Sequence, residues 1–321
     1  MNKKKVCLIV ILVAIIAVAC FAIFRPGASK IKENGKIKIV SSNFASYDFL
    51  RAIIGDNENI ELTFLLGPGK DAHSYDPTAA DLITIQNADL FVYVGGEMEN
   101  WSDKVLGSLD TNGQKIICIS DFVDTIEEKE VDGAEAEEEE EEEEGAFDEH
   151  IWASPENAVK MVQALEQAME EIDSNNSEKY KENAEKYIAE IKDVDSKIRD
   201  IVDNRVRDRL VFGDKMPMQY FIDYYGLKVS AAFSGCSTET EPSASTIAYL
   251  ETKVKEEEIP VVLYVELSNG KVAKTIASEV DGCEAMQIQA LHNVSLDDFN
   301  NGETWVSLMT RNLEVLKKAL Q

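Results

Sequence analysis

Two stretches of this 321-residue chain alternate short apolar segments with helical patterns, and a long helical stretch separates them. The predicted strands of the first stretch are 36–40, 60–66, 90–94 and 115–120, and those of the second are 209–212, 227–233, 260–266 and 285–291. Strands that alternate with helices at this spacing form parallel sheets covered on both faces. The pattern therefore predicts an α/β protein with two lobes, each with a mostly parallel sheet flanked by helices.

The helical stretch between the two blocks runs from about residue 155 to residue 204. In its second part, apolar residues recur near helical spacing among many lysines and glutamates, which suits a rigid connector. The length of the chain accommodates two domains of ordinary size. We expect an N-terminal lobe over residues 36–176, a long linking helix over 177–205 and a C-terminal lobe over 206–321.

The first 28 residues have the form of an export signal. Three lysines, Lys3 to Lys5, precede an apolar run from Val6 to Phe24, and a basic segment before an apolar one directs secretion. Ala17-Val-Ala-Cys20 resembles a bacterial lipobox, in which Cys20 carries the lipid. An uncleaved anchor is the other interpretation, because 19 apolar residues nearly span a bilayer. Either way we expect the rest of the chain outside the cell, tethered to the membrane.

Three cysteines, Cys118, Cys236 and Cys283, belong to the exported part, so at most one disulfide can form there. Cys118 lies in an apolar run and is predicted to be a core residue. A bridge between Cys236 and Cys283 suits an oxidising compartment, and the sequence leaves it open.

The formal net charge of -28 excludes a nucleic-acid partner, because such a surface cannot neutralise phosphates. Part of this charge is a run of eight glutamates, Glu137 to Glu144, inside residues 127–146. A block of like charges repels itself and buries no core, so this segment is predicted to be a disordered acidic loop. The alternative is that its carboxylates concentrate divalent cations near a site.

The chain has only three histidines, His73, His150 and His292, and all three follow a predicted strand or precede a predicted helix. Thr78 and Asp81 form a capping box after the first, and Ser154-Pro155 opens a helix after the second. Each histidine alone is compatible with a surface position. Open α/β sheets bind ligands at the carboxyl ends of their strands, and neutral imidazole is the commonest zinc ligand. Together they predict that the fold brings the three imidazoles onto one metal ion.

Five sequence segments resemble those of the metal-specific solute-binding proteins of bacterial ABC importers, the zinc/manganese group. They are Pro68-Gly-Lys-Asp-Ala-His-Ser-Tyr-Asp-Pro-Thr78, Met98-Glu-Asn-Trp101, Asp148-Glu-His-Ile-Trp-Ala-Ser-Pro-Glu-Asn157, Glu239-Thr-Glu-Pro-Ser243 and Lys271-Val-Ala-Lys-Thr-Ile-Ala277. The resemblance covers nearly all of residues 36–321. It implies two α/β lobes, a rigid linking helix and a metal held between the lobes.

The resemblance also implies a ligand set, in which His73 and His150 match the first two ligands of the family. Lys215 stands at about the position of the third, so that ligand is absent or replaced by Asp214. The fourth is an acidic residue close to 289–292, where His292 offers an imidazole instead. The remaining candidates are Glu239, Glu241 and Cys236, and Glu241 is expected to cap the following helix. Three imidazoles favour Zn²⁺ over Mn²⁺, which prefers more oxygen ligands.

The function implied is that of a membrane-tethered extracellular receptor that captures Zn²⁺ and hands it to the permease and ATPase of an ABC importer. We expect a monomer without enzymatic activity. The alternatives are a receptor for Mn²⁺ or another divalent metal, and an adhesin or interaction protein with a structural metal. A secreted zinc hydrolase is disfavoured, because the chain has no His-Glu-x-x-His segment. Since neutral imidazoles bind metal, affinity is predicted to fall as the pH drops through roughly 6.5.

Overall fold

The computed structural model describes residues 35–134, 147–234 and 241–321. The predictions for the export segment with Cys20, for the glutamate run and for Cys236 and Glu239 fall outside these ranges. Residues 36–321 form one compact unit. Within the described ranges no helix has both the length and the apolar character that crossing a bilayer requires.

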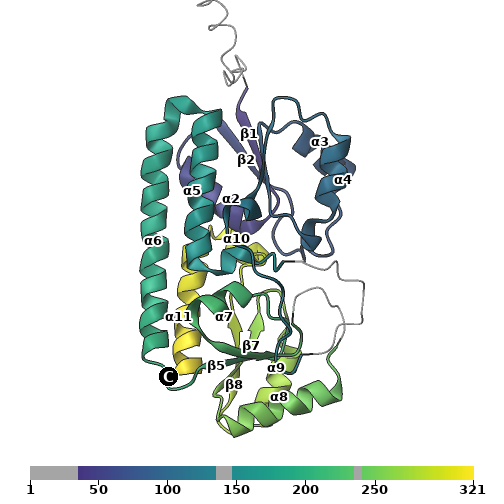
Figure 1. Cartoon of the computed structure of the whole chain (residues 1–321), viewed down its shortest axis with the longest axis vertical. Coiled ribbons are helices and arrows are strands. Elements are labelled where there is room, and N and C mark those ends of the chain that lie inside the picture. The colour runs from purple at the N-terminus through teal and green to yellow at the C-terminus, as the bar shows by residue number, and fades with distance from the viewer. Residues whose placement is uncertain (1–34, 135–146, 235–240) are drawn as a thin grey trace, which may run out of the picture. The chain divides into compact units, whose positions relative to one another are not determined.

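Two four-stranded sheets, both entirely parallel, form the framework (Figure 1). The first has the order β2-β1-β3-β4, made of Ile60–Phe64, Ile37–Ser41, Leu90–Tyr93 and Lys115–Cys118. The second has the order β6-β5-β7-β8, made of Lys228–Ala231, Arg209–Phe212, Val261–Val265 and Glu284–Ile288. In each sheet the first strand in sequence lies between the second and the third. Both halves thus share one topology, and the predicted fold class is confirmed.

The helices of the first half are α2 (Phe44–Ile54), α3 (Ala79–Gln86), α4 (Trp101–Ser108), α5 (Pro155–Ile172) and α6 (Ser177–Asp203). Those of the second half are α7 (Gln219–Tyr225), α8 (Ala244–Glu256), α9 (Lys271–Ser278), α10 (Leu296–Asn300) and α11 (Trp305–Leu320). Sequence analysis missed only α10, a single short turn of helix that Ser295 caps by accepting a hydrogen bond from the Asp298 amide. A five-residue helix is too short to leave a periodic signal.

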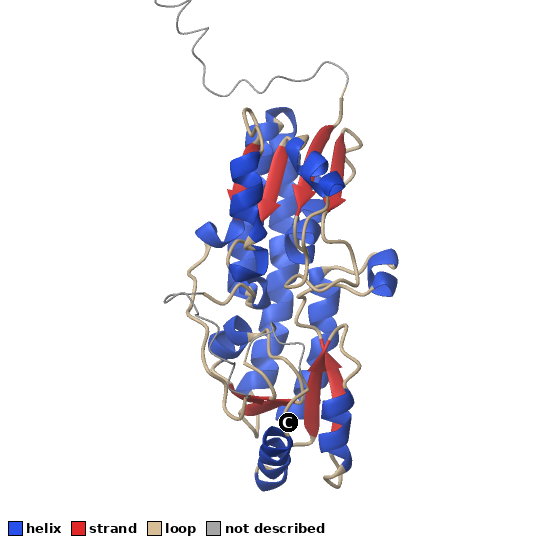
Figure 2. Ribbon diagram, turned by 90° about the vertical axis from the view of Figure 1, so that its right-hand side faces the viewer, coloured by secondary structure: helices blue, strands red, loops and turns tan. Residues whose placement is uncertain are grey.

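The linking helix α6 packs against α5, α2 and α11 (Figure 1). Figure 2 shows long helices running behind the strands. Its buried residues recur every three or four positions along one face: Tyr180, Ala184, Tyr187, Ile191, Val194, Ile198, Ile201 and Val202. Charged side chains occupy the opposite face, so the helix is amphipathic along its 27 residues. Burial on three neighbouring helices explains why so polar a sequence forms a straight connector.

A buried carboxylate joins the two halves beside α6. Asp48 on α2 accepts hydrogen bonds from the Tyr187 hydroxyl of α6, from the Trp305 amide of α11 (2.7 Å) and from the Arg51 guanidinium (2.5 Å). The last helix of the chain therefore packs on the N-terminal half, although the expected C-terminal lobe includes it. The domain boundaries at residues 176 and 205 stay predictions.

The segment predicted as a disordered loop makes specific contacts in its first part, residues 127–134. Glu127 pairs with Phe147 in an isolated β-bridge, and Asp132 pairs in the same way with Ser230. Asp132 also accepts from the Arg209 guanidinium at 3.1 Å, and Val131 is buried. The prediction of disorder is therefore wrong for residues 127–134. These residues precede the glutamate run, and they include a buried apolar side chain, Val131, and a paired carboxylate, Asp132.

The remaining cysteines of the described chain, Cys118 and Cys283, are half-buried free thiols. Cys118 was predicted to be a core residue but is only half-buried, and its thiol donates a hydrogen bond to the Val94 carbonyl at 3.2 Å.

Candidate metal centre

His73 lies in the loop between β2 and α3, at the carboxyl edge of the first sheet. The Asp71 carboxylate accepts the His73 amide hydrogen at 2.9 Å and so shapes the turn that carries the imidazole. The predicted capping box follows, because Thr78 and Asp81 each bond the other's backbone amide. The short polar loop therefore has a defined path.

His292 lies in the loop between β8 and α10, at the carboxyl edge of the second sheet. The buried Glu266 carboxylate, which follows β7, accepts from the amides of Ala290 (2.7 Å) and His292 (2.8 Å). Leu291 between them has φ 63°, a left-handed conformation that is strained for a branched side chain. The two hydrogen bonds to Glu266 on either side of Leu291 stabilise this strained conformation and so fix the backbone that carries the His292 side chain.

The His292 loop is tied directly to the His73 loop. The Asn293 side-chain amide donates to the carbonyls of Gly67 (3.0 Å) and Lys70 (2.6 Å), and the Gly69 amide donates to the Val294 carbonyl (2.8 Å). These bonds join loops more than two hundred residues apart in sequence. They explain how the fold brings the first and third histidines together.

His150 directly precedes the short 3₁₀ helix η3 (Ile151–Ala153), which leads into α5. One oxygen of the Asp148 carboxylate accepts from both the His150 amide and its Nδ1, each at 2.8 Å. This contact assigns the proton to Nδ1 and the lone pair to Nε2, the arrangement typical of a metal-binding histidine with a supporting carboxylate. Trp152 packs edge-on against the imidazole, with ring centroids 5.4 Å apart.

The three imidazoles converge. Their ring centroids are 5.9 Å apart for His73 and His150, 5.4 Å for His73 and His292, and 5.6 Å for His150 and His292. One nitrogen from each lies within 4.8 Å of the other two. Ligand nitrogens of a tetrahedral zinc site are roughly 3.4 Å apart, so a small inward shift would complete the triangle. Nε2 of His292 is buried and has no hydrogen-bond partner in the described part of the chain, which is costly unless another ligand satisfies it.

The environment of the site keeps two imidazoles neutral. The pKa of His73 is lowered to about 4, chiefly by burial and then by the nearby His150, with Lys215 acting in the same direction and Asp71 and Asp148 acting against them. Burial also holds the pKa of His292 well below its usual value, with His150, His73 and Lys215 acting in the same direction. A neutral imidazole presents a lone pair to a cation without first losing a proton.

We expect the imidazoles of His73 and His292 in the metal-free protein to stay neutral at pH values where free histidine is protonated. The expected result is a midpoint near pH 4 for His73 and one far below 6.5 for His292, measured from imidazole NMR shifts between pH 3.5 and 8. Between the lowered pKa of each histidine in the fold and its ordinary pKa near 6.5 in the unfolded chain, the unfolded chain binds more protons. The metal-free fold should therefore lose stability as the pH falls through that interval. Midpoints near 6.5 for both would contradict this. The loss of zinc affinity through protonation of these two ligands is therefore expected at a lower pH than the roughly 6.5 predicted from sequence.

Of the other predicted ligands, Asp214 lies outside the triangle and Glu239 lies outside the described residues. Asp214, in the loop after β5, is outside the group of ligand atoms within 4.8 Å; one oxygen accepts from the Lys215 amide, and the other is buried without a described partner. Glu239 belongs to the residues that the structure does not describe. Glu241 was expected to cap α8, but Ser243 caps it and Glu241 pairs with Lys271 at 2.9 Å. Ligation by Asp214 or Glu239 stays a prediction.

Sequence reasoning overlooked the carboxylates that position the imidazoles. Asp71 and Asp148 each stand two residues before a histidine and accept that histidine's amide hydrogen. The repeated Asp-x-His spacing was a readable signal. Glu266 had a weaker one, a single acidic residue at the end of an apolar strand. Asn293 had none, because its partners lie in the other half of the chain.

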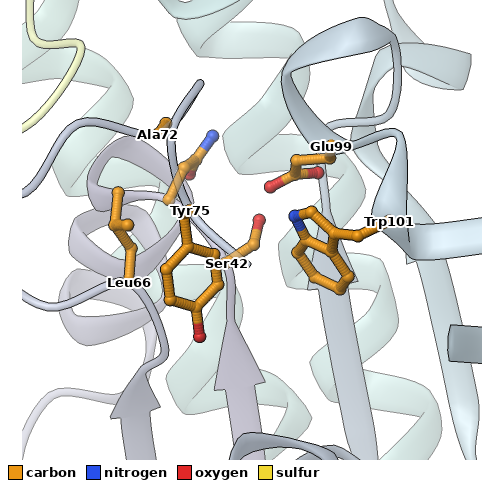
Figure 3. A pocket seen from close by; sticks show the side chains of 7 residues that line it. Ser42, Leu66, Ala72, Tyr75, Glu99 and Trp101 are labelled. Atoms are coloured by element: carbon orange, nitrogen blue, oxygen red, sulfur yellow. The ribbon is translucent and has the colours of Figure 1, made fainter. Parts of the chain in front are cut away.

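A small cavity lies behind the His73 loop and is lined by Ser42, Asn43, Leu66, Ala72, Tyr75, Glu99 and Trp101. Figure 3 shows the Ser42 hydroxyl, the Glu99 carboxylate and the Trp101 indole nitrogen directed toward one another. The Trp101 nitrogen is buried without a partner among the described residues. A volume of about 10 Å³ suits one internal water. None of the imidazoles lines this cavity, so it supports the loop from behind rather than forming the metal centre.

Known proteins are similar to this chain in sequence and in fold. A family described as zinc-uptake complex component A, periplasmic, matches residues 39–319. The high-affinity zinc uptake system protein ZnuA of Bacillus subtilis is 31% identical over 320 residues, covering 100% of this chain and 99% of that protein. The zinc-binding lipoprotein AdcA of Streptococcus pneumoniae is 29% identical over 98% of this chain, which spans 61% of AdcA.

Among solved structures, the Zn(II)-bound ZnuA-like domain of Streptococcus pneumoniae AdcA superposes with a TM-score of 0.73 at 28% sequence identity. The match covers 89% of this chain and 99% of that domain. The shared fold therefore extends over both sheets and the helices that join them.

Proposed function

This chain belongs to the family of periplasmic zinc-uptake complex component A, and from that premise we propose that it is an exported, membrane-tethered receptor that captures Zn²⁺. The ion would be held between the two parallel sheets by His73, His150 and His292. The receptor would then deliver the ion to the permease and ATPase of an ABC importer. It would act by binding and release, without catalysing a reaction.

The observation that carries the proposal is the convergence of three imidazoles from loops of both halves, with nitrogens within 4.8 Å of one another. The buried, unpartnered Nε2 of His292 supports it, because nothing in the described fold explains that nitrogen as a structural group. A site assembled from two sheets also suits cargo, since a relative shift of the loops would make and break the coordination.

Zinc is the metal that best fits these donors. Three neutral nitrogens match its preference for nitrogen and sulfur ligands in tetrahedral geometry. Manganese prefers oxygen ligands and higher coordination numbers. The relatives named for zinc binding or uptake and the apolar run after three lysines at the N-terminus support an exported zinc receptor.

The test is a metal-binding titration of the full chain after removal of metal by chelation. We expect one zinc per chain, competed reversibly by a chromophoric chelator, and at least about 100-fold weaker binding of Mn²⁺. The circular dichroism spectrum should be the same with and without metal. Unfolding on metal removal would instead identify a structural ion, as in the adhesin or interaction protein considered above.

Delivery requires a cellular test. A strain without this gene should take up radioactive zinc more slowly from zinc-poor medium, and the wild-type gene should restore the rate. A variant that lacks all three imidazoles should fail to restore it while reaching the same abundance. Normal uptake by the triple variant would overturn the receptor role.

A further inference from the structure

Asn293, the residue after the third histidine, is fully buried and uses its whole side chain in hydrogen bonds. Its amide nitrogen donates to the Gly67 carbonyl at 3.0 Å and to the Lys70 carbonyl at 2.6 Å. Its oxygen accepts from the Val294 amide at 2.7 Å. Two carbonyl acceptors require two N–H donors, so the orientation of this amide is fixed and both of its hydrogens are used.

The loop that receives these bonds is folded back on itself. Gly67 and Gly69 have φ angles of 73° and 75°, a conformation that glycine adopts without strain. This path presents the carbonyls of residues 67 and 70 to the same side chain, and it directs the Gly69 amide to the Val294 carbonyl at 2.8 Å. Three hydrogen bonds thus join the two loops within a few residues.

This connection lies beside two of the three imidazoles. Asn293 adjoins His292, and Lys70 is three residues before His73, whose amide is fixed by Asp71 at 2.9 Å. The rings of these two histidines are stacked with centroids 5.4 Å apart, the smallest of the three separations. The two loops cannot separate at the metal centre unless the bonds of Asn293 break.

The chain beyond this connection is attached to the first half as well. The Phe299 ring of α10 packs against the Tyr47 ring of α2, with centroids 5.7 Å apart. The Glu303 carbonyl accepts from the Arg51 guanidinium at 2.7 Å. Removing the Asn293 side chain would therefore free only the few residues between the third histidine and α10. The expected effect is local, at the site, and not a separation of the two halves.

We propose that Asn293 is a positioning residue that determines how long the site retains zinc. Its bonds hold the imidazoles of His73 and His292 close together before the metal arrives, so little free energy is lost in ordering the loops on binding. Release of the ion requires the same bonds to break. The inference rests on the proposed zinc-receptor function and assigns the control of release to one side chain.

The test measures two quantities in the full chain and in Asn293→Ala. Zinc dissociation, followed by stopped flow with excess chelator, should be about 10-fold faster in the variant, the lower end of the effect of supporting groups, with an unchanged association rate. Hydrogen exchange of the Gly69 amide in the metal-free protein should be at least about 10-fold faster. The Ala290 amide, which bonds Glu266, should keep its wild-type exchange.

Asn312→Ala is the matched control. Asn312 is also fully buried, and its side chain bonds the Gln289 amide and carbonyl, both at 2.8 Å. This variant should lower the midpoint of urea unfolding, as Asn293→Ala does, and keep the wild-type zinc dissociation and Gly69 exchange. Asn293→Ser, whose hydroxyl can donate only one hydrogen bond, should give intermediate values. It carries the test if the alanine variant does not fold.

The outcomes separate the inference from the proposed function. Wild-type zinc dissociation and Gly69 exchange in the Asn293 variants would overturn the inference and leave the receptor function in place. Equal acceleration in Asn312→Ala would also overturn it, because a general loss of stability would then explain the effect. No zinc binding by the wild type would overturn the proposed function itself, and the role in zinc release with it.

Discussion

Replacing His292 by alanine is expected to weaken zinc binding by at least about 100-fold, because the loss of a direct ligand should exceed the 10- to 100-fold effect typical of its supporting residues. The metal-free protein should keep its stability. Nε2 of His292 makes no hydrogen bond in the described structure, and the backbone amide that bonds Glu266 remains in the variant. Competitive zinc titration and urea unfolding of the metal-free chain measure the two effects separately.

His150→Ala provides a matched comparison. It should weaken zinc binding to a similar degree, but it should also cost the metal-free protein about 1–3 kcal/mol, because the buried Asp148 carboxylate loses its bond to Nδ1. Gln287→Ala, an exposed change on the strand that leads to His292, should alter neither quantity. Wild-type zinc affinity in His292→Ala would exclude this imidazole and move the third ligand to Asp214 or Glu239.

Trp152→Ala is expected to lower the free energy of unfolding by about 3–5 kcal/mol, the cost of removing a large ring from a packed core. The side chain is fully buried, and its indole donates to the Ala290 carbonyl at 3.1 Å. The Trp152 carbonyl in turn accepts from the Trp305 indole at 3.0 Å. The residue thus connects the His150 segment to the His292 loop and to α11.

Because Ala290 is two residues from His292, loosening this contact should also weaken zinc binding by about 10-fold, the lower end of the effect of supporting groups. Trp152→Phe is the control: it keeps most of the ring and loses only the hydrogen bond, so it should cost about 1 kcal/mol. Guanidinium unfolding of the metal-free variants at pH 7 measures the two losses of stability, and competitive zinc titration measures the change in affinity. A cost below about 1 kcal/mol together with wild-type zinc affinity in the alanine variant would show that neither the fold nor the site depends on this packing.

The positions of the three histidines along the chain could be predicted from the sequence, but their convergence could not. Strand and helix patterns placed His73, His150 and His292 in loops that follow strands or precede helices, and the described structure has each of them in such a loop. Their convergence depends on bonds such as Asn293 to Gly67, which leave no mark in local sequence. Lys215 was recognised at a ligand position by resemblance, whereas its burial and its effect on two imidazoles came from the packing of both halves.

Local sequence was sufficient for the strands and for the α-helices of the described chain other than α10, because helix and strand patterns depend on residues a few positions apart and on which face they bury. It was sufficient also for the cap at Thr78 and for the identity of the imidazoles, but not for the cap of α8, which is Ser243 and not Glu241. Only the tertiary structure decided that α11 returns to α6, that residues 127–134 pack on the second sheet, and that two histidines have lowered pKa values. These features arise from contacts between distant segments, where burial and neighbouring charges are properties of the assembled fold and not of any segment alone.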